Sequence, residues 1–423
     1  MLHKISLLYK NHQHRINISI LILLTVSVFY NHLGNYYLAA DDFSNLLHSE
    51  KNFFGSFVTN TYGQKSGGDY RPIEVLSHQM DRLLYGDDNV TGRHITNLIF
   101  HILNVIQVYL LASVLTRKKT IAFLAALIFA IHLIHGTSHS QPVTWISGRV
   151  EVFLVFFYLL SILLFLRFFR EGSKASYLFS LTAFSLALLS KEMAATLPII
   201  IFLFLILSKD KQDDDRILYP LFWVFLFIGS LLLLAGFILT PSLAAKFLSH
   251  DGIIQQATIN RIRFSQDILK IGGACLIVIV SGVMILDKKF RESNKYSLLK
   301  YAVPYFLIFC IYMILRFLIL QGLGGHYQSS HGTNLIAVFG YDSFARDIYA
   351  LAGFLWPLDN RYVFYLYKLY AENTFVFYLA ASIILIILLF ILRKLFYSKS
   401  KLYLFIFLWI FITLLPVHNF ILN

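Results

Sequence analysis

The chain has 423 residues, of which 57% are hydrophobic and 14% charged, and its mean hydropathy is +0.67. That balance excludes soluble dehydrogenases, nucleases and repeat scaffolds and predicts an all-α polytopic membrane protein. The formal net charge is +13, for which membrane topology offers an explanation other than nucleic-acid binding. Both cysteines, Cys275 and Cys310, lie inside apolar runs, so neither a disulfide framework nor a cysteine metal site is supported.

Apolar runs long enough to cross a lipid bilayer recur from Ile16 almost to the C-terminus. They predict about 11 membrane helices in a single transmembrane domain over 1–423, with no soluble domain. In chain order the helices are expected at roughly 16–33, 94–115, 120–134, 143–168, 176–190, 193–208, 217–240, 268–286, 299–320, 374–392 and 402–415.

The basic residues indicate how these helices are oriented. With the N-terminus in the cytoplasm, the inner loops hold 21 Lys or Arg and 7 Asp or Glu, a net charge of +14, whereas the rest of the chain has a net charge of −1. Positive charge collects on the cytoplasmic loops of membrane proteins. We therefore expect a multi-pass protein of the bacterial inner membrane, or of the endoplasmic reticulum if the source is eukaryotic.

Three segments on the predicted outer side are long, at 34–93, 241–267 and 321–373, so the active site is expected on the extracytoplasmic face. In the first segment Pro72 can begin a helix that ends at Gly86. Its apolar face would hold Ile73, Leu76, Met80, Leu83 and Leu84. Its polar face would hold Glu74, Ser77, His78 and Asp81. A second helix is expected at 42–51. Both are expected to lie in the membrane interface, and ordinary loop helices are the alternative.

A polar stripe runs along the second predicted span. His94, Asn97, His101 and Asn104 stand at i, i+3, i+7 and i+10, so they share one helix face. That face must point toward protein or a water-filled cavity. Hydrogen bonds between helices explain the two asparagines without any further function. For His94, near the outer end, such hydrogen bonds and substrate binding are equally good explanations.

Charged residues from separate spans are predicted to lie near one depth. Arg149 stands close to the outer end of its span, Lys191 and Glu192 join two spans, and Arg316 precedes an outer loop. Ionisable residues inside a membrane are costly and are functional candidates by default. The alternative is that Arg149 and Arg316 extend toward lipid headgroups. Because these charges converge together with Asp41 and Asp42, we expect one outward-facing site.

Asp41 and Asp42 directly follow the first span. One aspartate there is enough to cap the next helix. Paired carboxylates beside a cavity can instead divide the work, one accepting a proton from an attacking hydroxyl and the other orienting it or holding a metal. Both interpretations stay open at this point.

Several short motifs in the first 200 residues occur in an order and spacing that resemble a known family. They are Asp41-Asp42, Tyr70-Arg71-Pro72, His94 with Asn97 and His101, Ile131-His132-Leu133-Ile134-His135, Trp145-Ile146-Ser147-Gly148-Arg149 with Glu151, and Ser190-Lys191-Glu192 followed by Pro198. This pattern resembles the transmembrane and tetratricopeptide-repeat-containing O-mannosyltransferases and their bacterial relatives, which are GT-C glycosyltransferases. Beyond position 200 the resemblance is limited to Arg316 and Leu355-Trp356-Pro357-Leu358. The chain ends at Asn423 without the repeats, so we expect a truncated or a minimal form.

The resemblance implies a GT-C-like bundle and transfer of a sugar, such as mannose, from a polyprenyl-phosphate donor to a hydroxyl acceptor on a protein or glycan, with inversion at the anomeric carbon. Arg149 and Lys191 would hold the donor phosphate, and Arg71 and Arg316 are further candidates. Asp41 is favoured as the base, with Asp42 as its orienting partner. The remaining candidates for substrate binding are His94, His101, Glu151 and Glu192. No cofactor is required, although a divalent metal fits.

Two other functions stay open. A metal transporter is suggested by His132, His135 and His139, which stand at i, i+3 and i+7 and could reach Asp41 or Asp42 as ligands. Transport would, however, need polar groups near the bilayer midplane, and the late spans are nearly devoid of charge. The other alternative is a non-catalytic, lipid-handling membrane protein that keeps the fold without the chemistry.

Overall fold

The computed structural model of the chain describes residues 2–34, 42, 53–61, 63, 68–87, 89–132, 143–207, 296–320, 390–391, 393–395 and 401–414. Over these residues every regular element is a helix. The elements, in chain order, are α1 (Leu2–Phe29), η1 (Tyr30–Gly34), η2 (Phe53–Phe57), α3 (Pro72–Tyr85), α4 (Val90–Thr116), α5 (Lys119–His132), η4 (Ile146–Gly148), α6 (Arg149–Glu171), α7 (Lys174–Ser190), η5 (Glu192–Thr196), α8 (Leu197–Leu207), α12 (Tyr296–Leu320) and α17 (Lys401–Leu414).

Four helical segments in the described ranges are long and apolar enough to cross a membrane: His12–Gly34, Val90–Thr116, Ile146–Glu171 and Tyr301–Leu320. The shorter helices α5, α7, α8 and α17 coincide with four more of the predicted spans. The predicted spans at 217–240 and 268–286, and nearly all of 374–392, lie outside the described residues. The helical membrane fold is therefore confirmed over the described residues, and the protein is integral to the membrane, whereas the count of about 11 spans stays a prediction.

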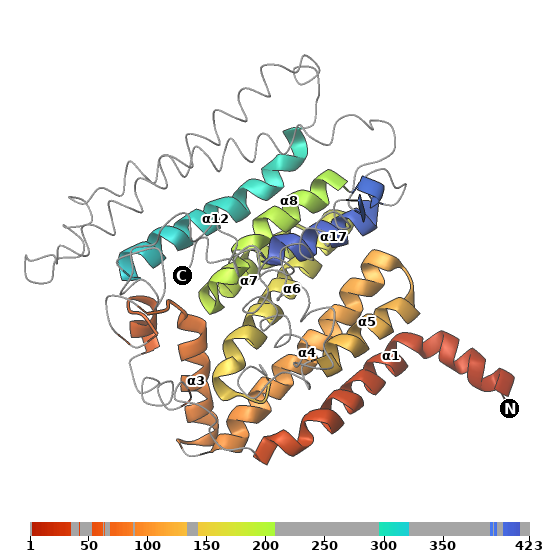
Figure 1. Cartoon of the computed structure of the whole chain (residues 1–423), viewed down its shortest axis with the longest axis horizontal. Helices are drawn as coiled ribbons and strands as arrows, with labels where there is room; N and C mark the ends of the chain where they lie inside the picture. Colours follow the sequence, from red (N-terminus) through yellow and green to blue (C-terminus); the bar gives the residue numbers. More distant parts are fainter. Residues whose placement is uncertain are drawn as a thin grey trace, which may run out of the picture.

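The longest described helices lie side by side as a bundle, and α3 lies at one end of it (Figure 1). A tight hairpin joins α6 to α7, where Gly172 adopts φ 69° and its N–H donates to the carbonyl of Phe168 at 2.8 Å. Only glycine takes that left-handed conformation without strain. Ser173 then caps α7, its side chain accepting from the N–H of Ser176. These two residues fold α7 back along α6.

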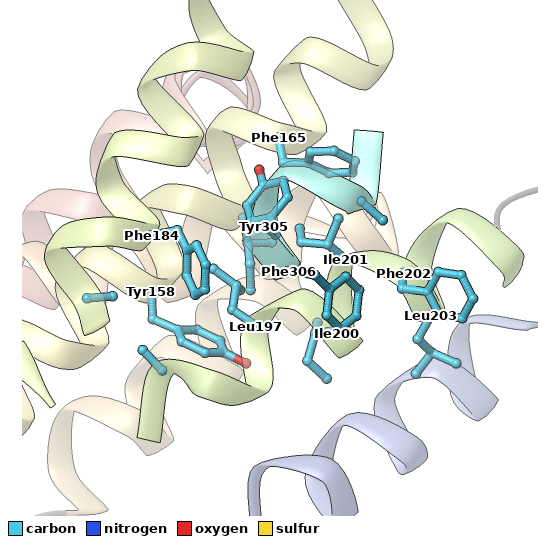
Figure 2. Close-up of a cluster of buried hydrophobic side chains, with 14 of the residues drawn as sticks. Tyr158, Phe165, Phe184, Leu197, Ile200, Ile201, Phe202, Leu203, Tyr305 and Phe306 are labelled. Atoms are coloured by element: carbon cyan, nitrogen blue, oxygen red, sulfur yellow. The ribbon is translucent and has the colours of Figure 1, made fainter. Parts of the chain in front are cut away.

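The larger part of the core lies between α6, α7, α8, α12 and α17, and Figure 2 shows its aromatic and aliphatic side chains. Phe165, Phe184 and Tyr305 are fully buried there. A hydroxyl network also crosses this core, since Ser161 donates to the carbonyl of Ser180 at 2.7 Å and the Ser180 and Tyr305 hydroxyls lie 2.6 Å apart. In lipid, such polar bonds and close packing drive helix association, because the surrounding acyl chains are as apolar as the core.

A second core joins α1, α4 and α5. Ala122, Ala126 and Ala130 stand at i, i+4 and i+8 on α5 and are fully buried. Small side chains at this spacing let neighbouring helix backbones approach closely. They pack beside Leu21 of α1 and Tyr109 of α4, which are also fully buried.

The helix predicted from Pro72 is present as α3 and ends before Gly86. Its polar face points into the protein, for Glu74, His78 and Asp81 are 4%, 1% and 2% exposed. Its apolar face points outward, with Leu83 and Leu84 79% and 66% exposed. This is the orientation expected of a helix that presents its apolar side to lipid. The second expected helix, at 42–51, lies outside the described residues except for Asp42.

Candidate functional site

A buried ion pair ties α3, α4 and α6 together at this end of the bundle. Arg149, the first residue of α6, is fully buried, and its Nη2 lies 2.5 Å from Oδ2 of Asp81 on α3. The guanidinium also donates from Nε to Oδ1 of Asn97 at 2.8 Å and from Nη2 to the carbonyl of Arg93 at 2.9 Å. Arg149 therefore does not reach the surface as a headgroup anchor would.

The two asparagines of the polar stripe bond neighbouring backbone. Asn97 donates from Nδ2 to the carbonyls of Trp145 and Ile146 at 3.0 and 3.3 Å. Asn104 donates to the carbonyl of Val152 at 2.9 Å. The hydrogen bonds expected between helices are thus present, and they fix the start of α6 against α4.

Asp42 anchors the same segment from the other side. Its Oδ1 accepts from the backbone N–H of Ser147 at 2.9 Å and from the Ser147 hydroxyl at 2.6 Å, and the side chain is buried. Asp42 therefore caps η4, which leads directly into α6. Asp41 lies outside the described residues.

A second charged group surrounds Glu192 in η5. Arg71 Nη2 and Arg316 Nη1 each lie 3.4 Å from a Glu192 carboxylate oxygen. Arg71 also pairs with Asp69 at 3.1 Å, and Arg316 donates to the Tyr312 hydroxyl at 3.3 Å. Residues from the first loop, η5 and α12 thus meet although they are far apart in the sequence. Arg316 is fully buried, so it too does not extend to the surface.

Lys191 precedes η5 and forms an ion pair with Glu151 of α6. The lysine side chain is 15% exposed and the carboxylate 36% exposed, so this pair lies nearer the surface than the others. The prediction that Lys191 and Glu151 belong to one neighbourhood agrees with this contact.

Glu74 of α3 connects the two charged groups electrostatically. Burial raises the pKa of its carboxyl to about 7, against the opposing positive charge of Arg71. Asp69 raises this pKa further, whereas Lys191 and Arg149 lower it. Cations from both charged groups, the one around Arg149 and the one around Glu192, thus influence the pKa of this carboxyl.

Several buried donors in these groups have no hydrogen-bond partner within the described part of the chain. They are Nε of Arg71, Nη1 of Arg149, and Nε and Nη2 of Arg316. Both ring nitrogens of His78 are likewise unpartnered there, and the pKa of this histidine lies well below its usual value because of burial and the nearby charges of Arg149 and Arg93. Buried donors are normally satisfied, and guanidinium donors suit phosphate or carboxylate oxygens.

The two histidines of the polar stripe occupy different surroundings. His94 is buried in the first turns of α4. His101 packs against Phe29 of α1 and Phe129 of α5, and its Nε2 lies 3.4 Å from the carbonyl of Ala130. His101 is therefore placed among α1, α4 and α5.

Of the metal ligands expected from the sequence, the side chain of His132 and all of His135 and His139 lie outside the described residues. Within the described ranges, no three His, Cys, Asp or Glu side chains are grouped so that they could hold a metal ion.

Sequence reasoning missed two carboxylates of this site. Asp81 and Glu74 were assigned only to the polar face of the interfacial helix, and Arg93 was not singled out. The available indication was the amphipathic pattern itself. If the apolar face of α3 contacts lipid, its polar face must contact the protein, and buried carboxylates there need cationic partners.

Comparison with known proteins adds the following. A family model described as dolichyl-phosphate-mannose-protein mannosyltransferase matches residues 82–239. The human protein O-mannosyl-transferase TMTC4 is 29% identical over 164 residues, covering 34% of this chain and 21% of that protein. Over the matched region the chain is thus similar to protein O-mannosyltransferases. The Drosophila melanogaster relative Tmtc1 is 27% identical over 175 residues, covering 41% of this chain and 19% of its own length.

These matches cover about a fifth of the length of the curated relatives. The matched family region contains Arg149, Glu151, Lys191 and Glu192 but begins after Arg71. Among solved structures, the apo oligosaccharyltransferase of Archaeoglobus fulgidus aligns with 97% of this chain and 50% of its own, at 14% identity and a TM-score of 0.37. A likeness at that level does not establish a shared fold.

Proposed function

We propose that the protein is a membrane glycosyltransferase with a GT-C-like bundle that transfers a sugar from a polyprenyl-phosphate donor to a hydroxyl acceptor on the extracytoplasmic face. Mannose is the proposed sugar and a protein the favoured acceptor, since the matching family is described as dolichyl-phosphate-mannose-protein mannosyltransferase. The relationship to O-mannosyltransferases and the apolar helices support this proposal.

The observation that carries the proposal is the convergence of cationic side chains, one of them fully buried, on the segment around Glu192. Arg71, Arg316 and Lys191 come from three separate parts of the chain, and the two arginines share the carboxylate of Glu192. Both arginines retain unpartnered donors within the described structure. Buried guanidinium donors are normally satisfied, so the unpartnered donors of these ion-paired arginines support an anionic ligand.

In the proposed reaction, the donor phosphate lies against Arg71, Arg316 and Lys191. Arg149 contributes through Nη1, because its Nε and Nη2 are already engaged by Asn97 and Asp81. One guanidinium would thus bind protein groups through Nε and Nη2 and the phosphate of the sugar donor through Nη1. Cationic groups here stabilise the negative charge that develops on the departing phosphate.

The acceptor hydroxyl is proposed to lose its proton to Asp41 as its oxygen attacks the anomeric carbon. The new bond forms on the face opposite the phosphate, the bond from carbon to phosphate oxygen breaks, and the phosphate leaves with the electron pair, so the configuration is inverted. Asp42, held by Ser147, positions this segment. His94 is proposed to donate a hydrogen bond to the sugar or phosphate, whereas Glu151 and Glu192 orient the cations.

The test is transfer of label from radiolabelled polyprenyl-phosphate mannose by the purified chain in lipid nanodiscs, with membrane proteins as acceptors. Arg316→Gln removes one cation of the site, and we expect a loss of donor use by roughly 10-fold or more. Arg167→Gln is the matched control, since Arg167 lies at the other end of α6 in an exposed pair with Glu171. Wild-type transfer by Arg316→Gln, or label that never leaves the lipid with any sugar tested, contradicts the proposal.

A further inference from the structure

A second cationic place lies at the opposite end of the bundle from α3, where α4, α6 and α8 end and α17 begins (Figure 1). A cavity of about 210 Å³ opens there, lined mainly by apolar side chains such as Leu166, Phe204, Leu207 and Phe405. Arg117, Arg170 and Lys401 also line it. It is thus an apolar slot bordered by positive charge.

A more polar hollow of about 430 Å³ adjoins this slot. Val114, Arg117 and Arg170 line both cavities, and the hollow adds His14 and Lys119. The two cavities are therefore contiguous, with the arginines at the boundary between the apolar and the polar part. No acidic side chain of the described residues lines either one.

The two arginines are held in place by the backbone. Arg117 ends α4 with φ 58°, and its N–H donates to the carbonyl of Ser113 at 3.0 Å. Arg170 donates from Nη2 to the carbonyl of Val114 at 3.0 Å, which fixes it across the end of α4. The carboxylate nearest in sequence, Glu171, is already paired with Arg167 at 2.8 Å. The positive charge at the cavities is therefore not neutralised by it.

We propose that these cavities bind an anionic phospholipid of the adjoining leaflet. The phosphate would lie between Arg117 and Arg170, with Lys119 and Lys401 nearby, and the first part of an acyl chain would enter the slot. Basic pockets between membrane helices suit anionic headgroups. The slot is smaller than the roughly 300 to 1,000 Å³ of pockets that enclose a drug-sized ligand, which favours a slender chain entering from the bilayer.

This inference does not depend on the proposed glycosyltransferase activity, because the cavities lie away from the charged groups around Glu192 and Arg149. The proposed lipid lies at the membrane surface opposite the charged groups, where it would hold the ends of α4, α6, α8 and α17 together. The positive-inside distribution assigns that surface to the cytoplasmic leaflet.

The test is native mass spectrometry of the full purified chain with added phosphatidylglycerol or with phosphatidylcholine of identical acyl chains. We expect phosphatidylglycerol to be retained in preference, and the double variant Arg117→Gln/Arg170→Gln to lose roughly 10- to 30-fold in its apparent affinity. Lys118→Gln/Lys174→Gln is the matched control, because it removes the same charge at the same end from residues that line neither cavity. It should retain the lipid normally.

A second variant separates the acyl chain from the headgroup. Leu402→Trp fills the slot without changing charge, and it should weaken phosphatidylglycerol binding, whereas excess inorganic phosphate should not displace the lipid from the wild type. Equal retention of the two lipids, equal loss in the control variant, or full displacement by phosphate would overturn the proposal. If the double variant fails to fold, unchanged lipid binding by Leu402→Trp overturns it as well.

Discussion

The ion pair between Asp81 and Arg149 offers a quantitative test of how the charged end of the bundle is built. Asp81→Asn preserves the shape of the side chain but removes its charge, leaving the fully buried Arg149 guanidinium without an ionic partner. Removing one member of a buried pair costs about 3 to 5 kcal/mol, because the remaining charge is desolvated and uncompensated. We expect the free energy of unfolding to fall by about that amount.

The measurement is reversible unfolding of the purified chain in bicelles, with Asp87→Asn as the matched control. Asp87 pairs with Arg82 one residue beyond Asp81, but these side chains are 57% and 32% exposed. An exposed pair is worth about 0 to 1 kcal/mol, so the control should be nearly silent. The double variant Asp81→Leu/Arg149→Met should be more stable than Asp81→Asn, because it leaves no charge behind. Equal small losses in Asp81→Asn and Asp87→Asn would refute the reasoning.

Three further predictions concern packing, pH and topology. A Cβ at Gly92 would overlap the side chain of Tyr85, so Gly92→Ala should lower the free energy of unfolding by about 1 to 3 kcal/mol, measured in the same bicelles, and an unchanged value would contradict that contact. Burial raises the pKa of Glu74 from 4.5 to about 7, so the folded state binds the proton more tightly than the unfolded state. The free energy of unfolding should therefore fall as pH rises from about 4.5 to 7, and Glu74→Gln should flatten this dependence. An equally steep pH profile in the variant would show that another group causes it. A cysteine label at position 67 should react with an impermeant reagent from the outer side and a label at position 173 should not. Reaction of both labels from the same side would contradict the proposed topology.

The predicted helices that the structure describes could be found from the sequence because lipid requires long apolar runs and internally satisfied backbone. Helix α3 was also predictable, since Pro72 marks its start and Gly86 its end and the apolar residues between them follow helical spacing. The interhelical role of Asn97 and Asn104 followed from their position on one face of an apolar helix.

The pairing of charges could not be predicted in the same way. Arg149 and Asp81 are far apart in the chain, and whether they meet depends on how α3 turns against α4 and α6. The same holds for Arg316 and Glu192, which come together only when α12 packs beside η5. Helical periodicity identifies which residues share a face, but tertiary packing decides which faces meet. Asp42 illustrates this, since it caps η4 through Ser147, more than 100 residues further along the chain.

The buried pairs also suggest why function and stability are linked at this end of the molecule. Each carboxylate that neutralises a cation lowers the cost of burying it, yet Arg71, Arg149 and Arg316 keep donors without partners in the described structure. A site that was only structural would be expected to satisfy these donors. Spare donors beside compensated charge are what an anionic substrate requires.

The central claim is that this chain catalyses sugar transfer, and Asp→Asn substitution at the acidic pair tests it most directly. Asparagine keeps the shape and can still accept the hydrogen bonds of a cap, but it does not act as a general base. Turnover of labelled polyprenyl-phosphate mannose should therefore fall by roughly 10²- to 10⁴-fold in Asp41→Asn, with binding of the sugar donor and the melting temperature in detergent near wild type. Asp42→Asn should instead lose stability, because its hydrogen bonds with Ser147 weaken. Normal turnover by both folded variants would contradict the account.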